Sequence, residues 1–461
     1  MSRNSHRISS AFIYFFGSFG GILFGYDIGV MTGALPFLQS DWHLQNAATL
    51  TGWITSAVMF GAIFGGAIAG QLSDKYGRRK MILASAITFV IFSVLSGISP
   101  SNGHVGAIYL IVVRMFLGLA VGAASALVPA YMSEMAPAEM RGRLSGLNQT
   151  MIVSGMLLSY IVDFVLKDFP GKIAWRLMLG LAAVPALILY LGVLRLPESP
   201  RFLLLNGEDQ EARNVLSIIR KNTNEIDLEM NTISRTANQE RSADENSSYK
   251  TLFSGKFRYL VIAGVGVATF QQFQGANAIF YYIPLIVQKA TGKAASSNLM
   301  WPIIQGIILV IGSLVYMWIA DKFNRRTLLM IGGSAMGLSF ILPAVLNKLI
   351  PNLNPMTIVV FLCIYVAFYS ATWAPLTWVL VGEIFPLAIR GRASGLASSC
   401  NWIGSWLVGL IFPIMTAHMP QEIVFAIFGI ICVLGVLFVK FCVPETRGHT
   451  LEEIESAGTK R

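Results

Sequence analysis

Two charged residues, Asp27 and Arg114, lie within long apolar stretches of this sequence. An Asp or Arg near the centre of a membrane-spanning helix costs about 2.5 to 3.5 kcal/mol on insertion scales, so such residues are seldom incidental. At 1.5 Å per residue, Asp27 would lie ~24 Å and Arg114 ~26 Å from the inner ends of their helices. The two side chains are therefore predicted to pair at one depth, where Asp27 could carry a proton. A static pair that fixes helix packing is the alternative.

Amide and aromatic side chains are the second group that could do chemistry. An amide both donates and accepts hydrogen bonds, as a sugar hydroxyl requires, but Asn and Gln also join helices to one another. Tryptophan rings could stack on the C–H face of a sugar, although packing and interfacial anchoring remain open. The candidates are Gln271, Gln272, Asn277 and Tyr281 in one apolar stretch, Trp378 in a later one, and Asn401 and Trp402 in the next.

The composition indicates which elements position these residues. Of 461 residues, 54% are apolar and 13% are charged, against roughly a quarter charged in a soluble domain. Apolar runs of about 20 residues suit helices that cross a bilayer. We expect an all-α membrane protein with twelve transmembrane helices, the tenth broken at Pro375. The expected spans are residues 11–38, 48–72, 81–98, 106–131, 144–166, 174–194, 258–287, 297–320, 327–348, 356–383, 393–417 and 421–442.

The net charge of +10 does not indicate nucleic-acid binding, because the basic residues lie in short connections between apolar runs. The loops assigned to the cytoplasm hold eleven Lys and Arg and the opposite loops about five, which predicts that both termini are cytoplasmic in a cell membrane. All four cysteines fall within predicted spans, so no disulfide framework, metal site or cofactor is expected. An enzyme is not expected, because no paired nucleophile and base or phosphate-binding loop is present.

The two halves of the chain repeat each other, with offsets of 247, 249 and 247 residues. Such a repeat of six helices in parallel orientation builds the major facilitator fold, which holds substrate near the midplane. We therefore predict six-helix halves at 1–200 and 258–443, a cytoplasmic linker with short helices at 201–257, and a tail at 444–461. The matching motifs are DKYGRR at 74–79 with DKFNRR at 321–326, Glu134 and Arg141 with Glu383 and Arg390, and Pro197-Glu198 with Pro444-Glu445.

Charged residues in these motifs are predicted to form a cytoplasmic gate. Carboxylates and arginines there can bind each other and the ends of helices. Such contacts would act as a latch that holds the cytoplasmic side of the protein closed. The alternative is that they only orient the protein in the membrane. The gate candidates are Asp74, Arg78, Arg79, Glu134, Arg141, Glu198, Asp321, Arg325, Arg326, Glu383, Arg390 and Glu445.

The combined motifs resemble the sugar porter family of the major facilitator superfamily, above all its bacterial proton-coupled xylose and glucose symporters. The resemblance covers nearly the whole chain. It is carried by Gly25-Tyr26-Asp27, the Asp-x-x-Gly-Arg-Arg loop, Arg114 before Gly118 and Gly122, Pro129-x-Tyr131-x-x-Glu134, Pro197-Glu-Ser-Pro-Arg201, Gln271-Gln272, Glu383-Ile-Phe-Pro386, and Pro444-Glu-Thr-Arg-Gly448.

The resemblance implies symport of a monosaccharide with a proton by alternating access. The chain is expected to lie in the lipid bilayer and to act as a monomer. It implies that Arg114 controls proton binding at Asp27, because facilitative members carry an uncharged amide there. It also implies one sugar site made of Gln149, Gln271, Gln272, Asn277, Trp378 and Asn401, lined by Phe24, Tyr281 and Trp402.

Two departures from the family pattern leave questions open. Asn324 replaces a glycine and Met317 stands where another glycine is usual, which predicts a looser second gate loop. Met156 occupies a position where some relatives have Gln, so the preferred sugar is not fixed. A facilitative uniporter is the main alternative function. A nutrient receptor is a lesser one, because receptors that resemble this family carry long cytoplasmic tails.

Overall fold

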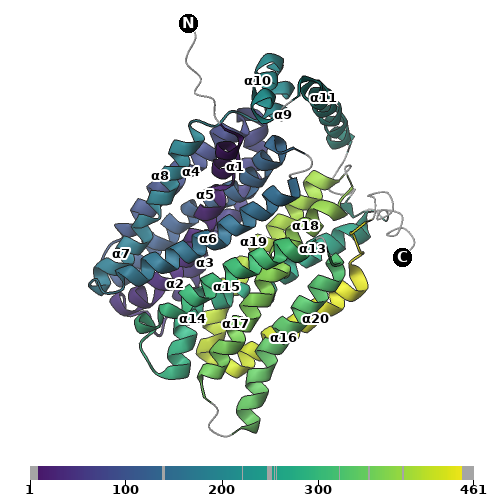
Figure 1. Ribbon diagram of the computed structural model, residues 1–461. Coiled ribbons are helices and arrows are strands. Elements are labelled where there is room, and N and C mark those ends of the chain that lie inside the picture. The colour runs from purple at the N-terminus through teal and green to yellow at the C-terminus, as the bar shows by residue number, and fades with distance from the viewer. Residues whose placement is uncertain are drawn as a thin grey trace.

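The computed structural model describes residues 9–137, 141–220, 222–246, 252, 253, 255, 257–320, 322–350, 354–386 and 389–448, with the side chains of 141–145, 236–246 and 296 excepted. These residues form a bundle of long helices in which the first half of the chain lies beside the second (Figure 1). The helices of the linker between the halves lie together at one end of the bundle. We call this end the linker end and the opposite end the far end.

The first half begins with a helix capped by Ser9, whose side chain accepts the amide hydrogen of Phe12. The stretch expected as the first span consists of two nearly continuous helices, and so does the sixth. The helices of this half are α1 Ser10–Ser18, α2 Gly20–Asp41, α3 Ala48–Tyr76, α4 Arg78–Gly97, α5 Gly103–Met135, α6 Arg141–Leu166, α7 Gly171–Leu181 and α8 Ala183–Val193.

The linker and the second half follow. Helix α10, with 11 residues, is a short helix of the kind expected in the linker, whereas α11 has 24 residues and is longer than expected. The remaining elements are α9 Pro200–Leu205, α10 Asp209–Ile219, α11 Thr223–Asn246, α13 Arg258–Phe273, α14 Ala276–Thr291, the 3-10 helix η2 Ala295–Asn298, α15 Met300–Ile319, α16 Arg325–Leu349, α17 Met356–Ala371, α18 Trp373–Ile384, α19 Arg390–His418 and α20 Gln421–Cys442.

Within the described residues, eleven helical stretches are long and apolar enough to cross a membrane. The expected span that is not among these eleven is the seventh, 258–287, because it divides into α13 and α14 of 16 residues each. The break lies at Gly275, whose φ of 92° is a conformation that side chains with a Cβ rarely adopt. The segment that holds the candidate amides is therefore an interrupted helix.

The tenth span is also interrupted. Helix α17 ends at Ala371, and Thr372 has φ −132° and ψ −81° before α18 begins. Pro375 lacks the N–H that would bond to the carbonyl of Ala371, and its ring clashes with that carbonyl. The break predicted near Pro375 is thus present, three residues before the proline.

Close helix contacts in the first half depend on residues without side chains. Along α2, a Cβ on Gly25 would lie 1.7 Å from the carbonyl oxygen of Ile152 on α6. On α5, a Cβ on Gly118 would lie 2.1 Å from the carbonyl oxygen of Val58 on α3. Such small residues let membrane helices approach to backbone contact. These two contacts fix α2 and α5, the helices that carry Asp27 and Arg114.

Candidate functional site

The structure brings Asp27 and Arg114 together in the interior of the first half. The guanidinium donates to both carboxylate oxygens, from Nη1 to Oδ1 at 3.4 Å and from Nη2 to Oδ2 at 3.3 Å. Both side chains are 1% exposed. This two-point contact neutralises two charges inside the protein, and protonation of Asp27 would remove one of those charges and weaken the contact.

The candidate amides form one hydrogen-bonded network between α13, α14 and α19, which we call the amide network. Asn401 Nδ2 donates to Gln271 Oε1 at 2.7 Å, and Gln272 Nε2 donates to Asn401 Oδ1 at 3.3 Å. Asn277 Nδ2 donates to Gln272 Oε1 at 3.0 Å and to Ser405 Oγ. Each amide is thus held in a fixed orientation by the others.

Gln271 also fixes the break in the tenth span. Its Nε2 donates to the carbonyl oxygens of Trp373 at 3.1 Å and Ala374 at 2.9 Å, the first two residues of α18. Buried Gln271 therefore satisfies all its hydrogen-bonding groups in this state. The structure thus shows interhelical bonding by Gln271, and its role in ligand binding stays a prediction.

Aromatic residues connect the amide network to the first half. The rings of Phe24 on α2 and Trp402 on α19 meet edge to face, with centroids 5.3 Å apart. Buried Tyr281 directs its hydroxyl at the sulfur of Met59 on α3, 3.2 Å away. The network thus lies beside the boundary between the halves.

Two sugar-site candidates stand apart from this arrangement. Trp378 on α18 is 41% exposed, and Gln149 on α6 is half-buried. In the described part of the chain, neither is hydrogen-bonded to the amide network. Their place in a sugar site stays a prediction.

Ser405 and Asp163 were missed from the sequence. Ser405 follows Asn401 by four residues, the spacing that puts two side chains on one helix face, so this signal was available. Asp163 is a carboxylate inside the predicted span 144–166 and lies buried on α6. Its position alone marked it as a candidate.

The gate candidates of the first half form a compact cluster at the linker end. Arg78 contacts Asp74 at 2.9 Å and Glu134 at 3.2 Å. Glu198 accepts the backbone N–H of Arg79 at 3.0 Å. All these residues belong to one half, so the cluster joins α3, α4 and α5 to the segment just before the linker.

The second half repeats the cluster. Arg325 contacts Glu383 at 3.3 Å, while Glu445 accepts the backbone N–H groups of Arg325 at 3.0 Å and Arg326 at 3.1 Å. Arg390 donates from Nε to the carbonyl oxygen of Phe385 at 3.1 Å. These contacts also lie within one half, and a latch between the halves stays a prediction.

Asp321 and the side chain of Arg141 lie outside the described residues. Asn324 has φ −65°, whereas Gly77 at the matching position has φ 93°, so the two loops take different backbone paths. A looser second gate loop stays a prediction.

The two halves contact each other closely toward the far end. Thr32 on α2 donates to the carbonyl oxygen of Phe280 on α14 at 2.6 Å. The hydroxyls of Thr55 and Tyr282 lie 2.5 Å apart, and Tyr282 also donates to the carbonyl oxygen of Gly409 at 2.9 Å. All of these groups are buried, so the far end is closed.

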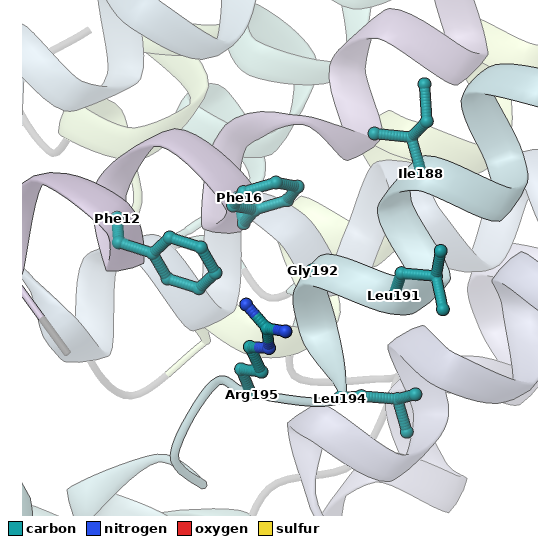
Figure 2. Close-up of a pocket in the computed structure, with 7 residues that line it drawn as sticks. All are labelled: Phe12, Phe16, Ile188, Leu191, Gly192, Leu194 and Arg195. Atoms are coloured by element: carbon teal, nitrogen blue, oxygen red, sulfur yellow. The ribbon is translucent and has the colours of Figure 1, made fainter. Parts of the chain in front are cut away.

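A cavity of about 380 Å³ lies elsewhere, between α1 and α8. Figure 2 shows Phe12 and Phe16 on one side and Ile188 and Leu191 on the other, with the side chain of Arg195 between them. Ile188 and Leu191 are exposed. This apolar hollow offers few of the hydrogen-bonding groups that a sugar requires and is separate from the amide network.

Comparisons with known proteins agree with this geometry. The sequence profile of a family described as "Sugar (and other) transporter" matches residues 13–457. The chain is 41% identical to a D-xylose transporter of Levilactobacillus brevis, covering 98% of this chain and 96% of the relative. It is 38% identical to the glucose transporter GlcP of Staphylococcus epidermidis, covering 96% of each.

The fold is similar to that of a solved transporter. The proton:xylose symporter XylE, a major facilitator superfamily protein solved with 6-bromo-6-deoxy-D-glucose, superposes with a TM-score of 0.81 at 29% identity. The superposition covers 99% of this chain and all of that one.

Proposed function

Since this chain belongs to the sugar porter family of the major facilitator superfamily and is a multi-pass sugar transporter, we propose that it carries a monosaccharide into the cell together with a proton. Xylose and glucose are the favoured substrates. Two of the relatives named above are a xylose and a glucose transporter. Inositol is a further candidate, because a myo-inositol transporter of Bacillus subtilis is 36% identical.

The amide network supports sugar binding. A sugar hydroxyl both donates and accepts a hydrogen bond, and so does each amide of the network. The contact between Gln272 and Asn401, at 3.3 Å, is the longest of the bonds between its amides. We expect this contact to open first and to exchange its partner for a hydroxyl. Gln149 and Trp378 would approach the sugar from the two halves when it binds.

Phe24 and Trp402 would then act between the halves. Their edge-to-face contact joins α2 to α19 beside the amide network. Sugar that enters there would separate or reorient the rings and so bias the packing of one half against the other. A ligand changes a conformational equilibrium only through such differential contacts.

The buried Asp27 to Arg114 pair is the single observation that carries proton coupling. Protonation of Asp27 removes one charge of the pair and releases Arg114, so the two protonation states favour different contacts between α2 and α5. The related XylE structure is that of a proton:xylose symporter. A uniporter would have no use for this ionisable pair beyond packing.

The orientation follows from charge. The loops at the linker end hold the larger share of Lys and Arg, so we place that end and both termini in the cytoplasm, with the far end outside. We assign the halves to 1–200 and 258–443, the linker to 201–257 and the tail to 444–461. Each chain holds a complete set of site residues, so we expect it to act as a monomer.

Uptake into vesicles tests the proposal. Purified protein in liposomes would be given labelled xylose, glucose, galactose, arabinose or inositol, with and without an imposed pH gradient. Symport predicts accumulation above the external concentration with the gradient and equilibration without it. Equilibration under both conditions would identify a uniporter, and uptake of none of these compounds would contradict the substrate class.

A further inference from the structure

Asp163 is a second carboxylate among the membrane helices, and neither the amide network nor the Asp27 pair uses it. It lies on α6 and is 1% exposed. In the described part of the protein, neither of its oxygens has a partner that meets hydrogen-bond geometry. The carboxylate faces the backbone of Gly33 on α2, where an added Cβ would lie 2.2 Å from Oδ2.

Three cations on or near the surrounding helices pair with other carboxylates, and Lys172 of α7 is exposed. Arg114 on α5 is paired with Asp27, and Lys167, four residues after Asp163, contacts Asp168 at 2.9 Å. On α7, Arg176 contacts Asp41 at 3.4 Å. The titratable groups that face Asp163 are the hydroxyls of Tyr26 on α2 and Tyr160 on α6, and α15 contributes the uncharged Gln305 next to Tyr160. None of these facing groups carries a positive charge.

A buried carboxylate that faces no cation is costly when ionised, because burial removes the water that stabilises its charge. A proton on the carboxyl group removes that charge. In this closed arrangement, the site therefore accommodates a neutral carboxylic acid better than a carboxylate.

Asp163 lies next to residues that form contacts between the two halves. Gly33 follows Thr32, which donates to the carbonyl oxygen of Phe280. Tyr160, three residues before Asp163, accepts a hydrogen bond of 3.5 Å from Gln305. Gly33 is six residues beyond Asp27, so this level is about 9 Å nearer the far end. Separation of the halves would remove both contacts and admit water to Asp163.

We propose that Asp163 binds a proton that accompanies closure of the far end. As the halves close, the carboxylate takes one proton from water on the far side and forms an O–H bond. As they separate, the group is hydrated, the O–H bond breaks, and the proton returns to the same side. Closure becomes dependent on external pH, and the number of protons carried across the membrane does not change.

This inference rests on the proposed alternation between two open states but not on proton symport. The test therefore uses protein with the Asp27→Asn substitution, which removes the other proton site. Exchange of labelled sugar across the vesicle membrane is measured at constant internal pH and increasing external pH. The rate should fall as the external pH rises, by up to about tenfold per pH unit, the limit for one proton.

Adding Asp163→Asn should abolish this pH dependence. Adding Asp168→Asn is the matched control, because this exposed carboxylate lies just after α6. In this control the slope of exchange rate against external pH should persist. A slope that survives Asp163→Asn, or no slope in the Asp27→Asn protein, overturns the proposal. A uniporter would fail the accumulation test above and still show this slope, so the two proposals fail separately.

A spectroscopic measurement needs no change at position 163. The infrared spectrum of the Asp27→Asn protein at neutral pH should contain the C=O stretching band of a protonated carboxyl group. Absence of the band would overturn the proposal even if the Asp163→Asn variant could not be purified. Loss of the band in Asp163→Asn, with retention in Asp168→Asn, would assign it.

Discussion

Arg114 on α5 holds Asp27 on α2 by two hydrogen bonds of 3.3 and 3.4 Å, with both side chains 1% exposed. The helices that carry them are held in place by close backbone contacts, of Gly118 on α5 with α3 and of Gly25 on α2 with α6. The pair can therefore respond to a proton only by changing its own hydrogen bonds or by moving a whole helix. This property makes it suited to link protonation to a change of state.

Asp27→Asn should abolish uphill sugar uptake and preserve sugar exchange. The amide keeps the shape of the side chain and one acceptor for Arg114, but it cannot bind and release a proton. Accumulation driven by an imposed pH gradient is measured beside counterflow in the same vesicles. Accumulation at the level of the parent protein would show that Asp27 is structural and that the proton site lies elsewhere.

Arg114→Gln should destabilise the protein more than the double change Asp27→Asn with Arg114→Gln. The single change leaves a buried carboxylate without its cation, which costs about 3 to 5 kcal/mol, whereas the double change leaves two neutral groups. Thermal unfolding in detergent compares the three proteins at one pH. Equal destabilisation in both variants would mean that the charge of Asp27 is already absent in the parent.

Gln271→Ala should weaken sugar binding by about 1 to 3 kcal/mol, because a hydroxyl in a desolvated site loses its partner. It should also lower stability, because the carbonyl oxygens of Trp373 and Ala374 lose their donor. Sugar affinity is measured by titration calorimetry on purified protein.

Gln274→Ala is the matched control for that experiment. Gln274 is also a buried amide of this segment, but its side chain lies against Gly435 on α20, outside the amide network. Its removal should leave affinity unchanged. Equal affinity in the parent and the Gln271→Ala variant would remove Gln271 from the sugar site.

Charge reversal at Glu134 or Arg390 should favour the state that is open at the linker end. Glu134 binds Arg78 in the cluster of the first half. Arg390, the first residue of α19, donates to the carbonyl oxygen of Phe385. Loss of either contact should loosen the ends of helices that must meet when the linker end closes. Introduced cysteines at both ends report accessibility to impermeant reagents, and identical labelling in variant and parent would contradict the latch.

The sequence by itself determined the class of fold and the depth of its main charges. Long apolar runs have no alternative to helices in a bilayer, because every backbone polar group must be paired internally. The rise per residue then placed Asp27 and Arg114 at one level. The repeated motifs likewise determined that Arg78 with Glu134 and Arg325 with Glu383 would occupy matching positions, which the structure confirms as matching contacts.

Only the tertiary structure decided which side chains share a partner. A residue's position along a helix does not give that helix's rotation, and the rotation decides whether Gln271 faces a ligand or the carbonyl oxygens of α18. The break at Gly275 divides the expected seventh span, so Gln271 and Asn277 lie on two different helices. The isolation of Asp163 likewise depends on the close approach of α2 to α6 at Gly33, because the neighbouring helix, and not the local sequence, supplies or withholds its partner.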